Sequence, residues 1–159
     1  MKMEALLLLA KIENNQYETS EILSLTDVTK KYLQLFNEVI KDRRVKVETH
    51  FNEEFLIKLH PLLADSLISN LVGNAVKYNY EDGSIIITID KNKYQIRNTS
   101  RLPPIDPAQL FKRFNNSKNR MDSSNGLGLA IVKKIADTHN LLITYHAEDG
   151  FHHFNIEKK

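Results

Sequence analysis

The sequence predicts an α+β fold, a two-layer sandwich in which one mixed, mostly antiparallel sheet is covered on one face by about three helices. Three observations indicate this class. Apolar residues recur at helical spacing in three long stretches. Two pairs of short β-type runs, each pair joined by a few polar residues, are typical of hairpins. Helices and strands do not alternate in the regular way that a parallel sheet with crossover helices requires.

The N-terminal part of the chain predicts two helices and a strand. Residues 1–18 contain "LLLLAKIENNQY", which we interpret as the last turns of an amphipathic helix; its apolar run is too short for a signal peptide. A second helix is expected over 25–39, where apolar residues follow one stripe, with Ser24 as its N-cap and Asp27 completing a capping box. The alternating "VKVETHF" then predicts a strand.

The longest helical pattern covers residues 56–79, with Pro61 near its first turn. The remaining elements follow in order: a hairpin formed by 85–90 and 94–98, a proline-rich loop over 99–107, one or two helical turns over 108–114, a polar stretch over 115–125, a helix over 126–140, and a terminal hairpin formed by 141–147 and 151–159.

Composition excludes several classes of protein. Among 159 residues, 22 Lys and Arg stand against 20 Asp and Glu, a balance that argues against a general nucleic-acid binder. The chain has no cysteine, which excludes disulfides and thiol catalysis. No apolar run approaches the ~18 residues that a membrane-spanning helix needs.

The stretch "NLVGNAVKYN" places polar residues on the long helix. At 100° per residue, Asn70, Asn74 and Lys77 fall within roughly 60° of one another, and Tyr78 flanks them. The opposite side is apolar and would pack on the sheet (Ile68, Leu71, Val72, Ala75, Val76). Two interpretations remain open from these residues alone: a solvated helix face, or a face that binds a polar ligand.

A second motif, "NGLGLAIVKK", opens a later helix with Gly126 and Gly128. Glycines permit close backbone approach, and the unpaired N–H groups at a helix start favour an anion. A short Gly-x-Gly can also be a tight turn, and the motif is not a P-loop because no Gly-Lys-Ser/Thr follows.

Taken together and in this order, the two motifs resemble those of sensor histidine kinases. Residues 19–159 resemble their catalytic ATP-binding domain, whose Bergerat fold is shared with gyrase, Hsp90 and MutL, and residues 1–18 resemble the end of the helical dimerisation hairpin before it. The resemblance implies ATP and Mg²⁺ as cofactors. It also implies transfer of the γ-phosphoryl group to a histidine on the hairpin. We expect the helix that carries this histidine to be missing from this sequence.

The resemblance also implies roles for single residues. Asn74 matches the asparagine whose side-chain oxygen binds Mg²⁺, while Asn70 and Lys77 match the residues near the phosphates. Tyr78 matches an aromatic residue beside the nucleotide. Residues 115–125 match the lid over ATP, in which Lys118 or Arg120 could reach the γ-phosphate. The remaining matches are the phenylalanine motif and the glycine box (Phe111, Phe114, Gly126, Leu127, Gly128); the two phenylalanines could equally anchor their segment to the core.

The sequence departs from the family pattern on the adenine side. Asn98 stands where the family has the aspartate that binds the adenine amino group, and no glycine follows it. Its amide oxygen can still accept a hydrogen bond, but without charge assistance. Ser124 replaces a common glycine. We therefore expect reduced nucleotide affinity.

Asn70 also bears on the reaction. Relatives that hydrolyse ATP carry a glutamate there as general base, and an amide cannot take the proton, so we expect phosphotransfer. None of the six histidines fits as the phosphoacceptor. His146, His152 and His153 are a candidate metal cluster, but no acidic partner is evident from the sequence.

The resemblance implies a homodimeric, membrane-anchored parent with this domain on the cytoplasmic side. The implied partners are its own hairpin and a response regulator, and no nucleic acid. Two alternatives stay open: a kinase-like module that docks partners without catalysis, and a kinase that phosphorylates serine on a partner.

Overall fold

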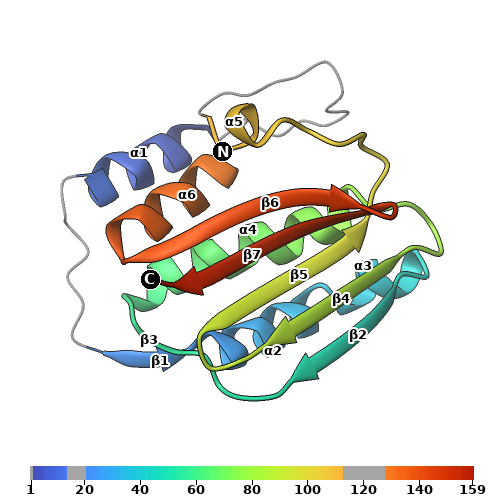
Figure 1. Cartoon of the computed structure of the whole chain (residues 1–159), viewed down its shortest axis with the longest axis horizontal. Helices are drawn as coiled ribbons and strands as arrows, with labels where there is room; N and C mark the ends of the chain where they lie inside the picture. The colour runs from blue at the N-terminus through green and yellow to red at the C-terminus, as the bar shows by residue number, and fades with distance from the viewer. Residues whose placement is uncertain (1, 14–20, 113–127) are drawn as a thin grey trace.

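The computed structural model describes residues 2–13, 21–112 and 128–159, which form two layers (Figure 1). One layer is a five-stranded sheet and the other is helical. The helices are α1 (Lys2–Glu13), α2 (Leu25–Leu35), α3 (Asn37–Asp42), α4 (Pro61–Lys77), α5 (Pro107–Leu110) and α6 (Gly128–Thr138). The strands are β1 (Ile22–Ser24), β2 (Lys46–Phe51), β3 (Leu56–Lys58), β4 (Ser84–Ile89), β5 (Lys93–Thr99), β6 (Leu141–Glu148) and β7 (Phe151–Lys158).

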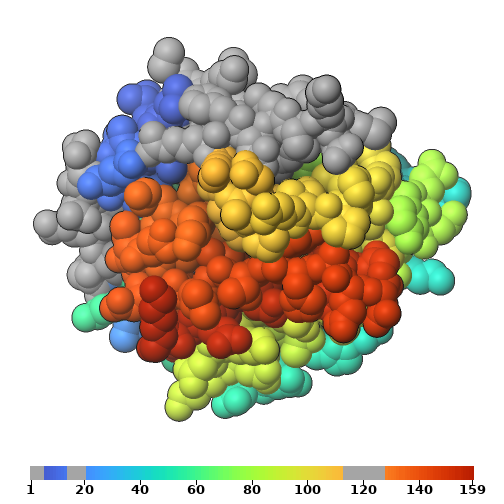
Figure 2. Space-filling model, turned by 45° about the horizontal axis from the view of Figure 1, so that its top comes forward, coloured from blue at the N-terminus to red at the C-terminus, as the bar shows by residue number. Residues whose placement is uncertain are grey.

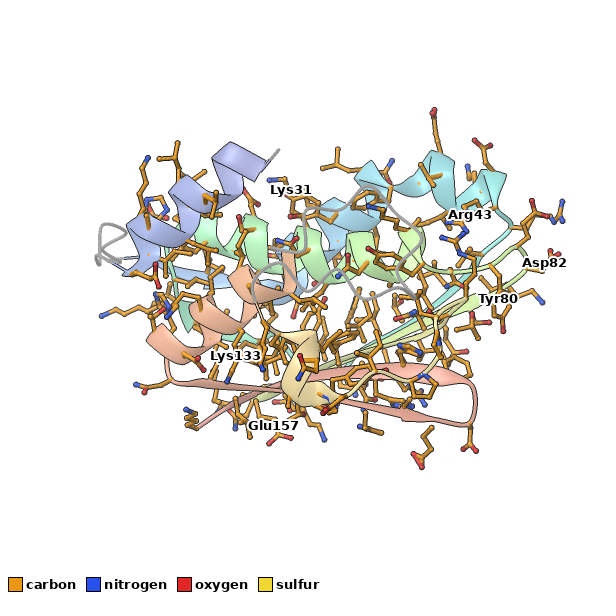
Figure 3. All side chains as sticks on the ribbon, turned by 90° about the horizontal axis from the view of Figure 1, so that it is seen from above. Lys31, Arg43, Tyr80, Asp82, Lys133 and Glu157 are labelled. Atoms are coloured by element: carbon orange, nitrogen blue, oxygen red, sulfur yellow. The ribbon has the colours of Figure 1, made fainter. Side chains whose placement is uncertain are left out.

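The large sheet has the strand order β2-β4-β5-β7-β6. Its β2–β4 pair is parallel, and the other three pairs are antiparallel. Both hairpins predicted from the sequence are therefore confirmed. Figure 3 shows the helices on one side of this sheet. The α+β sandwich is confirmed, and the other face of the sheet carries no helix within the described ranges.

Helix α4 lies across the middle of the sheet and contributes many residues to the hydrophobic core. Pro61 occupies its first turn, and Nδ1 of His60 accepts a hydrogen bond from the backbone N–H of Leu62 at 3.1 Å. Its apolar face is buried as the pattern predicts (Leu63, Ala64, Leu67, Ile68, Leu71, Val72, Ala75, Val76). Burying each large aliphatic side chain contributes roughly 1.5–3 kcal/mol, so this face fixes how α4 sits on the sheet.

Two expectations for the N-terminal half were wrong. Residues 56–58 form strand β3, paired antiparallel with β1, and α4 begins only at Pro61. The single helix expected over 25–39 is divided at Phe36, where the backbone leaves helical geometry between α2 and α3. The expected cap at Ser24 is confirmed, because its Oγ accepts from the N–H of Asp27 at 3.2 Å.

Helix α1 packs against α6. Leu9 and Ile12 are buried, and the ammonium group of Lys134 lies 3.8 Å from a carboxylate oxygen of Glu13. In this structure the segment therefore folds back on the domain. Within the described residues, no helix combines the length and the apolar content that crossing a bilayer would require.

Candidate functional site

The two sequence motifs meet between α4 and α6. The Asn70 side-chain nitrogen donates to the Ser66 carbonyl at 2.6 Å, and the amide oxygen is turned toward the first described turn of α6. A Cβ added at Gly128 would lie only 2.6 Å from that oxygen, far inside van der Waals contact. Glycine therefore lets α6 approach the amide row of α4 at this point.

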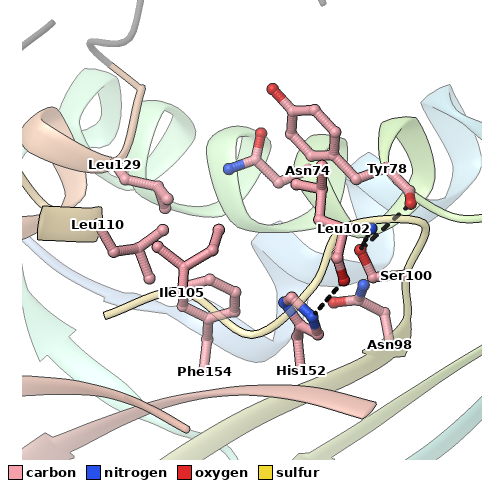
Figure 4. Close-up of a pocket in the computed structure, with 10 residues that line it drawn as sticks. All are labelled: Asn74, Tyr78, Asn98, Ser100, Leu102, Ile105, Leu110, Leu129, His152 and Phe154. Carbon is pink, nitrogen blue, oxygen red and sulfur yellow. Dashed lines mark hydrogen bonds between the residues drawn. The ribbon is translucent and has the colours of Figure 1, made fainter. Parts of the chain in front are cut away.

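A pocket adjoins this contact, between α4 and the helix-covered face of the sheet (Figure 4). The pocket is narrow and partly open to solvent. Asn74 and Tyr78 enter from α4, and Asn98 and His152 face them from β5 and β7. The wall is otherwise mostly apolar (Ser100, Leu102, Ile105, Leu110, Leu129, Phe154). Such a lining, with a few convergent polar groups, suits a flat heterocycle.

Asn98 is buried at the floor of this pocket. Its side-chain nitrogen donates to the Thr99 carbonyl at 2.9 Å, which orients the amide. With the nitrogen engaged, the side-chain oxygen is the acceptor that Asn98 retains for a ligand. The structure thus brings Asn74, Tyr78 and Asn98 together, as their sequence positions predict.

His152 lines the same pocket, a position that no sequence motif indicated. Its Nε2 lies 3.1 Å from the Leu102 carbonyl oxygen and its Nδ1 lies 3.0 Å from the Tyr145 hydroxyl, to which the Ile105 N–H donates at 3.3 Å. A carbonyl can only accept, so Nε2 carries the proton and Nδ1 accepts from Tyr145. Burial lowers the pKa of His152, which favours this neutral form. Both nitrogens are engaged, so His152 does not fit as a phosphoacceptor.

The loop between β5 and α5 is held on both sides. His152 and Tyr145 hold Leu102 and Ile105, as described above. At the other side, the Arg101 N–H donates to the Tyr78 carbonyl at 2.8 Å, and the Arg101 guanidinium donates to the Lys77 carbonyl at 2.9 Å. Figure 2 shows this segment, in yellow, lying along the red β6–β7 hairpin. Hydrogen bonds on both sides thus fix the loop between β5 and α5.

Other site residues are placed more simply. Lys77 is exposed, and its ammonium group lies 5.6 Å from the centre of the Tyr78 ring. Phe111 meets Phe154 edge to face with ring centres 6.4 Å apart, so it contacts the sheet side of the core. The rest of the expected site lies outside the described residues: Phe114, Lys118, Arg120, Ser124, Gly126, Leu127 and the lid over 115–125.

Asn79, the last residue of the asparagine motif, holds the end of α4. It is fully buried, and its side-chain nitrogen donates to the carbonyls of Ala75 and Ser84, each at 3.1 Å. Its side-chain oxygen accepts from the Thr99 hydroxyl at 2.6 Å. Sequence reasoning assigned it no role. A third asparagine directly before the turn at Gly83 was the available signal, because short polar residues there often bond local backbone.

A family described as histidine kinase-, DNA gyrase B-, and HSP90-like ATPases matches residues 60–157 of the chain. The chain belongs to this ATPase family. The match covers α4, the pocket and α6, and membership implies that the domain binds ATP.

Named relatives narrow the family to sensor kinases. The sensor histidine kinase HprS of Escherichia coli K12 is 31% identical over 159 residues, covering 96% of this chain and 35% of HprS. The first curated relatives that match are covered over 30% to 35% of their own length, so the chain spans about a third of each. This ATPase-family chain is thus similar to the catalytic ATP-binding part of sensor histidine kinases.

Solved structures share the fold. The histidine kinase ShkA in complex with AMPPNP superimposes with a TM-score of 0.75 at 21% identity, over 97% of this chain and 34% of ShkA. The histidine kinase ThkA in complex with the response regulator TrrA gives a TM-score of 0.63 at 22% identity, over 99% of this chain and 48% of that one.

Proposed function

We propose that this domain binds Mg²⁺–ATP between α4 and α6 and donates the γ-phosphoryl group to a histidine on the dimerisation hairpin of its parent protein. One observation carries the proposal: the Asn70 amide oxygen lies against Gly128, and a pocket runs from Asn74 to Asn98 beside that contact. The amide row and the glycine motif thus border one site, which is the arrangement that a bound triphosphate requires.

Different residues would hold different parts of the nucleotide. The Asn74 side-chain oxygen would hold Mg²⁺, which needs few protein oxygens because it keeps several waters. Asn70, Lys77 and the start of α6 would hold the phosphates, with Lys77 acting as a point charge. The adenine would lie among Tyr78, Asn98 and the apolar wall of the pocket.

The side chain at position 70 favours transfer over hydrolysis. Hydrolysis requires a base that takes a proton from water, and the Asn70 amide cannot do so. Phosphoryl transfer to an imidazole instead needs positioning and charge neutralisation. The unprotonated nitrogen of the acceptor imidazole would attack the γ-phosphorus while the bond from that phosphorus to the β,γ-bridging oxygen breaks, with ADP as the leaving group. The phosphorylated ring would then release its remaining N–H proton to water.

We further propose the partners that this role requires: the hairpin and a response regulator, with residues 1–18 as the end of the hairpin and 19–159 as the catalytic domain. The ThkA structure contains a response regulator, which supports the second partner. We also propose a cytoplasmic position beneath a membrane-bound, homodimeric parent protein. A structure described as the cytoplasmic segment of histidine kinase QseC has the same fold, which is consistent with the cytoplasmic position.

Titration of ATP by calorimetry, with and without Mg²⁺, tests the site. We expect a dissociation constant for ATP between micromolar and millimolar, which corresponds to a binding free energy of ~−4 to −8 kcal/mol. Asn74→Ala should remove the difference between the two conditions, because it removes the oxygen proposed for the metal. Asn92→Ala, an exposed change in the β4–β5 turn, is the control. If the ATP affinity of Asn74→Ala depended on Mg²⁺ as strongly as that of the unmodified chain, Asn74 would be excluded as the magnesium ligand.

A second candidate function is docking without catalysis. Two observations favour it: Asn98 is a neutral residue at the adenine position, and the loop after it contains no glycine. Absence of both binding heat and a thermal shift at several millimolar ATP would support this candidate over the kinase.

A further inference from the structure

The helix-free face of the sheet carries a group of metal-ligating side chains on the β6–β7 hairpin. His146 and Glu148 are two positions apart on β6, so they project from the same face. His153 is the partner of His146 on β7. His152, next in the chain, points instead into the pocket on the other face. The structure thus divides the histidine cluster of the sequence and adds the acidic partner that the sequence did not reveal.

The three side chains are close enough to share an ion. The imidazole rings of His146 and His153 are stacked, 4.3 Å between centres and 15° from parallel. Nε2 of His146 lies 3.9 Å from a Glu148 carboxylate oxygen, and one ligand atom from each residue lies within 4.8 Å of the other two. Ligands bonded at about 2.0–2.2 Å to one zinc ion lie roughly 3–3.5 Å apart. Stacked rings point their in-plane lone pairs side by side, so both imidazoles must rotate toward each other to bind one ion.

His153 supplies an independent sign of a ligand. The residue is only 8% exposed, yet its Nδ1 is buried and has no hydrogen-bond partner among the described residues. A buried nitrogen without a partner is destabilising, and a bound ion would satisfy it.

We propose that His146, Glu148 and His153 form a three-ligand site for a divalent transition-metal ion such as zinc. Two imidazoles and one carboxylate are a ligand set that zinc accepts in proteins, with a fourth position left for water. Calcium and magnesium do not fit, because they require oxygen ligands. The site lies outside the proposed nucleotide pocket and does not depend on it.

Arg97 carries a positive charge that repels a metal cation at this site. It is the β5 partner of His153, on the same face of the sheet, so its positive charge lies beside the proposed site. The Glu148 carboxylate offsets this charge. Arg97 therefore sets the affinity of the site, and its removal should tighten metal binding if the ion sits where we place it.

The chain contains a matched control on the same face. Glu48 and His50 on β2 have the same two-residue spacing, with Nε2 and a carboxylate oxygen 2.5 Å apart. Within the described residues, however, the grouping of three potential ligands within reach of one ion occurs at His146, Glu148 and His153, and not around His50. Variants of the two pairs thus separate a built site from general binding by surface histidines.

Calorimetric titration of the full chain with zinc chloride, without nucleotide, tests the proposal. We expect the unmodified chain and His50→Gln each to bind one zinc ion. His146→Gln and Glu148→Gln should bind zinc at least about tenfold more weakly, since even changes outside the ligand shell can cost that much affinity. Arg97→Gln should bind zinc more tightly than the unmodified chain. With cobalt(II), the unmodified chain should show a visible absorption band that is absent in His146→Gln.

The substituted side chains His146 and Glu148 are 51% and 62% exposed, so these variants should fold, and far-ultraviolet circular dichroism checks that they do. Affinities unchanged in both variants, or several weak ions per chain regardless of the variant, would overturn the site. Because the readout is the metal alone, this result is independent of whether the domain binds ATP.

Discussion

At the residue scale, the contact between Asn70 and Gly128 joins the two halves of the site. Gly128 does not adopt a left-handed backbone, so conformational freedom does not explain the glycine. The reason is the space that Asn70 occupies. Gly73, on the same helix as Asn70, differs in this respect, because a Cβ there would meet Phe36 at an ordinary 3.5 Å. The two glycines therefore predict opposite results on substitution by alanine.

Gly128→Ala should displace the Asn70 amide and weaken binding of an ATP analogue by about tenfold, the loss of roughly one charged hydrogen bond. Gly73→Ala should leave affinity unchanged and raise the free energy of unfolding by up to about 1 kcal/mol, through helix propensity. Calorimetry and urea unfolding measure the two quantities. Equal affinities for the two variants would show that the Asn70–Gly128 contact has no part in binding.

The sequence predicted the residues that carry a recognisable motif and missed those that act through distant partners. Asn74, Tyr78 and Asn98 were expected to share a site and do line one pocket. The importance of His152 depends on Leu102, which lies 50 positions away in the chain. Periodicity and local motifs contain no information about such pairs, so only the folded chain reveals them.

At the element scale, the position of α4 depends on what binds its C-terminal carbonyls. The Arg43 guanidinium donates to the carbonyls of Val76 at 2.6 Å and Lys77 at 3.2 Å, and also to that of Asn79. Figure 3 shows Arg43 at the same end of the molecule as Tyr80 and Asp82. A cation there also interacts favourably with the helix dipole. Arg43 thus helps to hold the turn of α4 that carries Lys77.

Arg43→Ala should lower the free energy of unfolding by about 2 kcal/mol, because the three carbonyls at and just beyond the end of α4 lose a charged donor. Its neighbour Arg44 is the control: its ion pairs with Glu81 and Asp82 are exposed, so Arg44→Ala should cost far less. Urea denaturation of both variants measures the difference. Comparable losses would mean that Arg43 contributes only general surface charge.

The hairpins were predictable because their β-type runs are separated by short polar turns. The error at residues 56–58 has a physical cause. Leu56, Ile57 and Leu59 suit either a strand or the first turn of a helix, and pairing with β1, a contact distant in sequence, decided for the strand. The break at Phe36 was missed because apolar spacing continues across it.

At the scale of the whole molecule, the pocket proposed for the nucleotide lies between α4, the sheet and the loop preceding α5. Hydrogen bonds to His152, Tyr145 and Tyr78 fix that loop. A site that is already ordered needs little reorganisation to bind a ligand. We therefore expect measurable ATP binding even though Asn98, at the proposed adenine position, carries no charge.

Nuclear magnetic resonance of the isotope-labelled chain, titrated with a non-hydrolysable ATP analogue and Mg²⁺, tests the proposed nucleotide site most directly. We expect saturable chemical-shift changes at the side-chain amides of Asn70, Asn74 and Asn98 and at the backbone N–H of Gly128, with the change at Asn74 dependent on Mg²⁺. Shifts confined to other parts of the chain, or none at several millimolar analogue, would contradict a nucleotide site between α4 and α6.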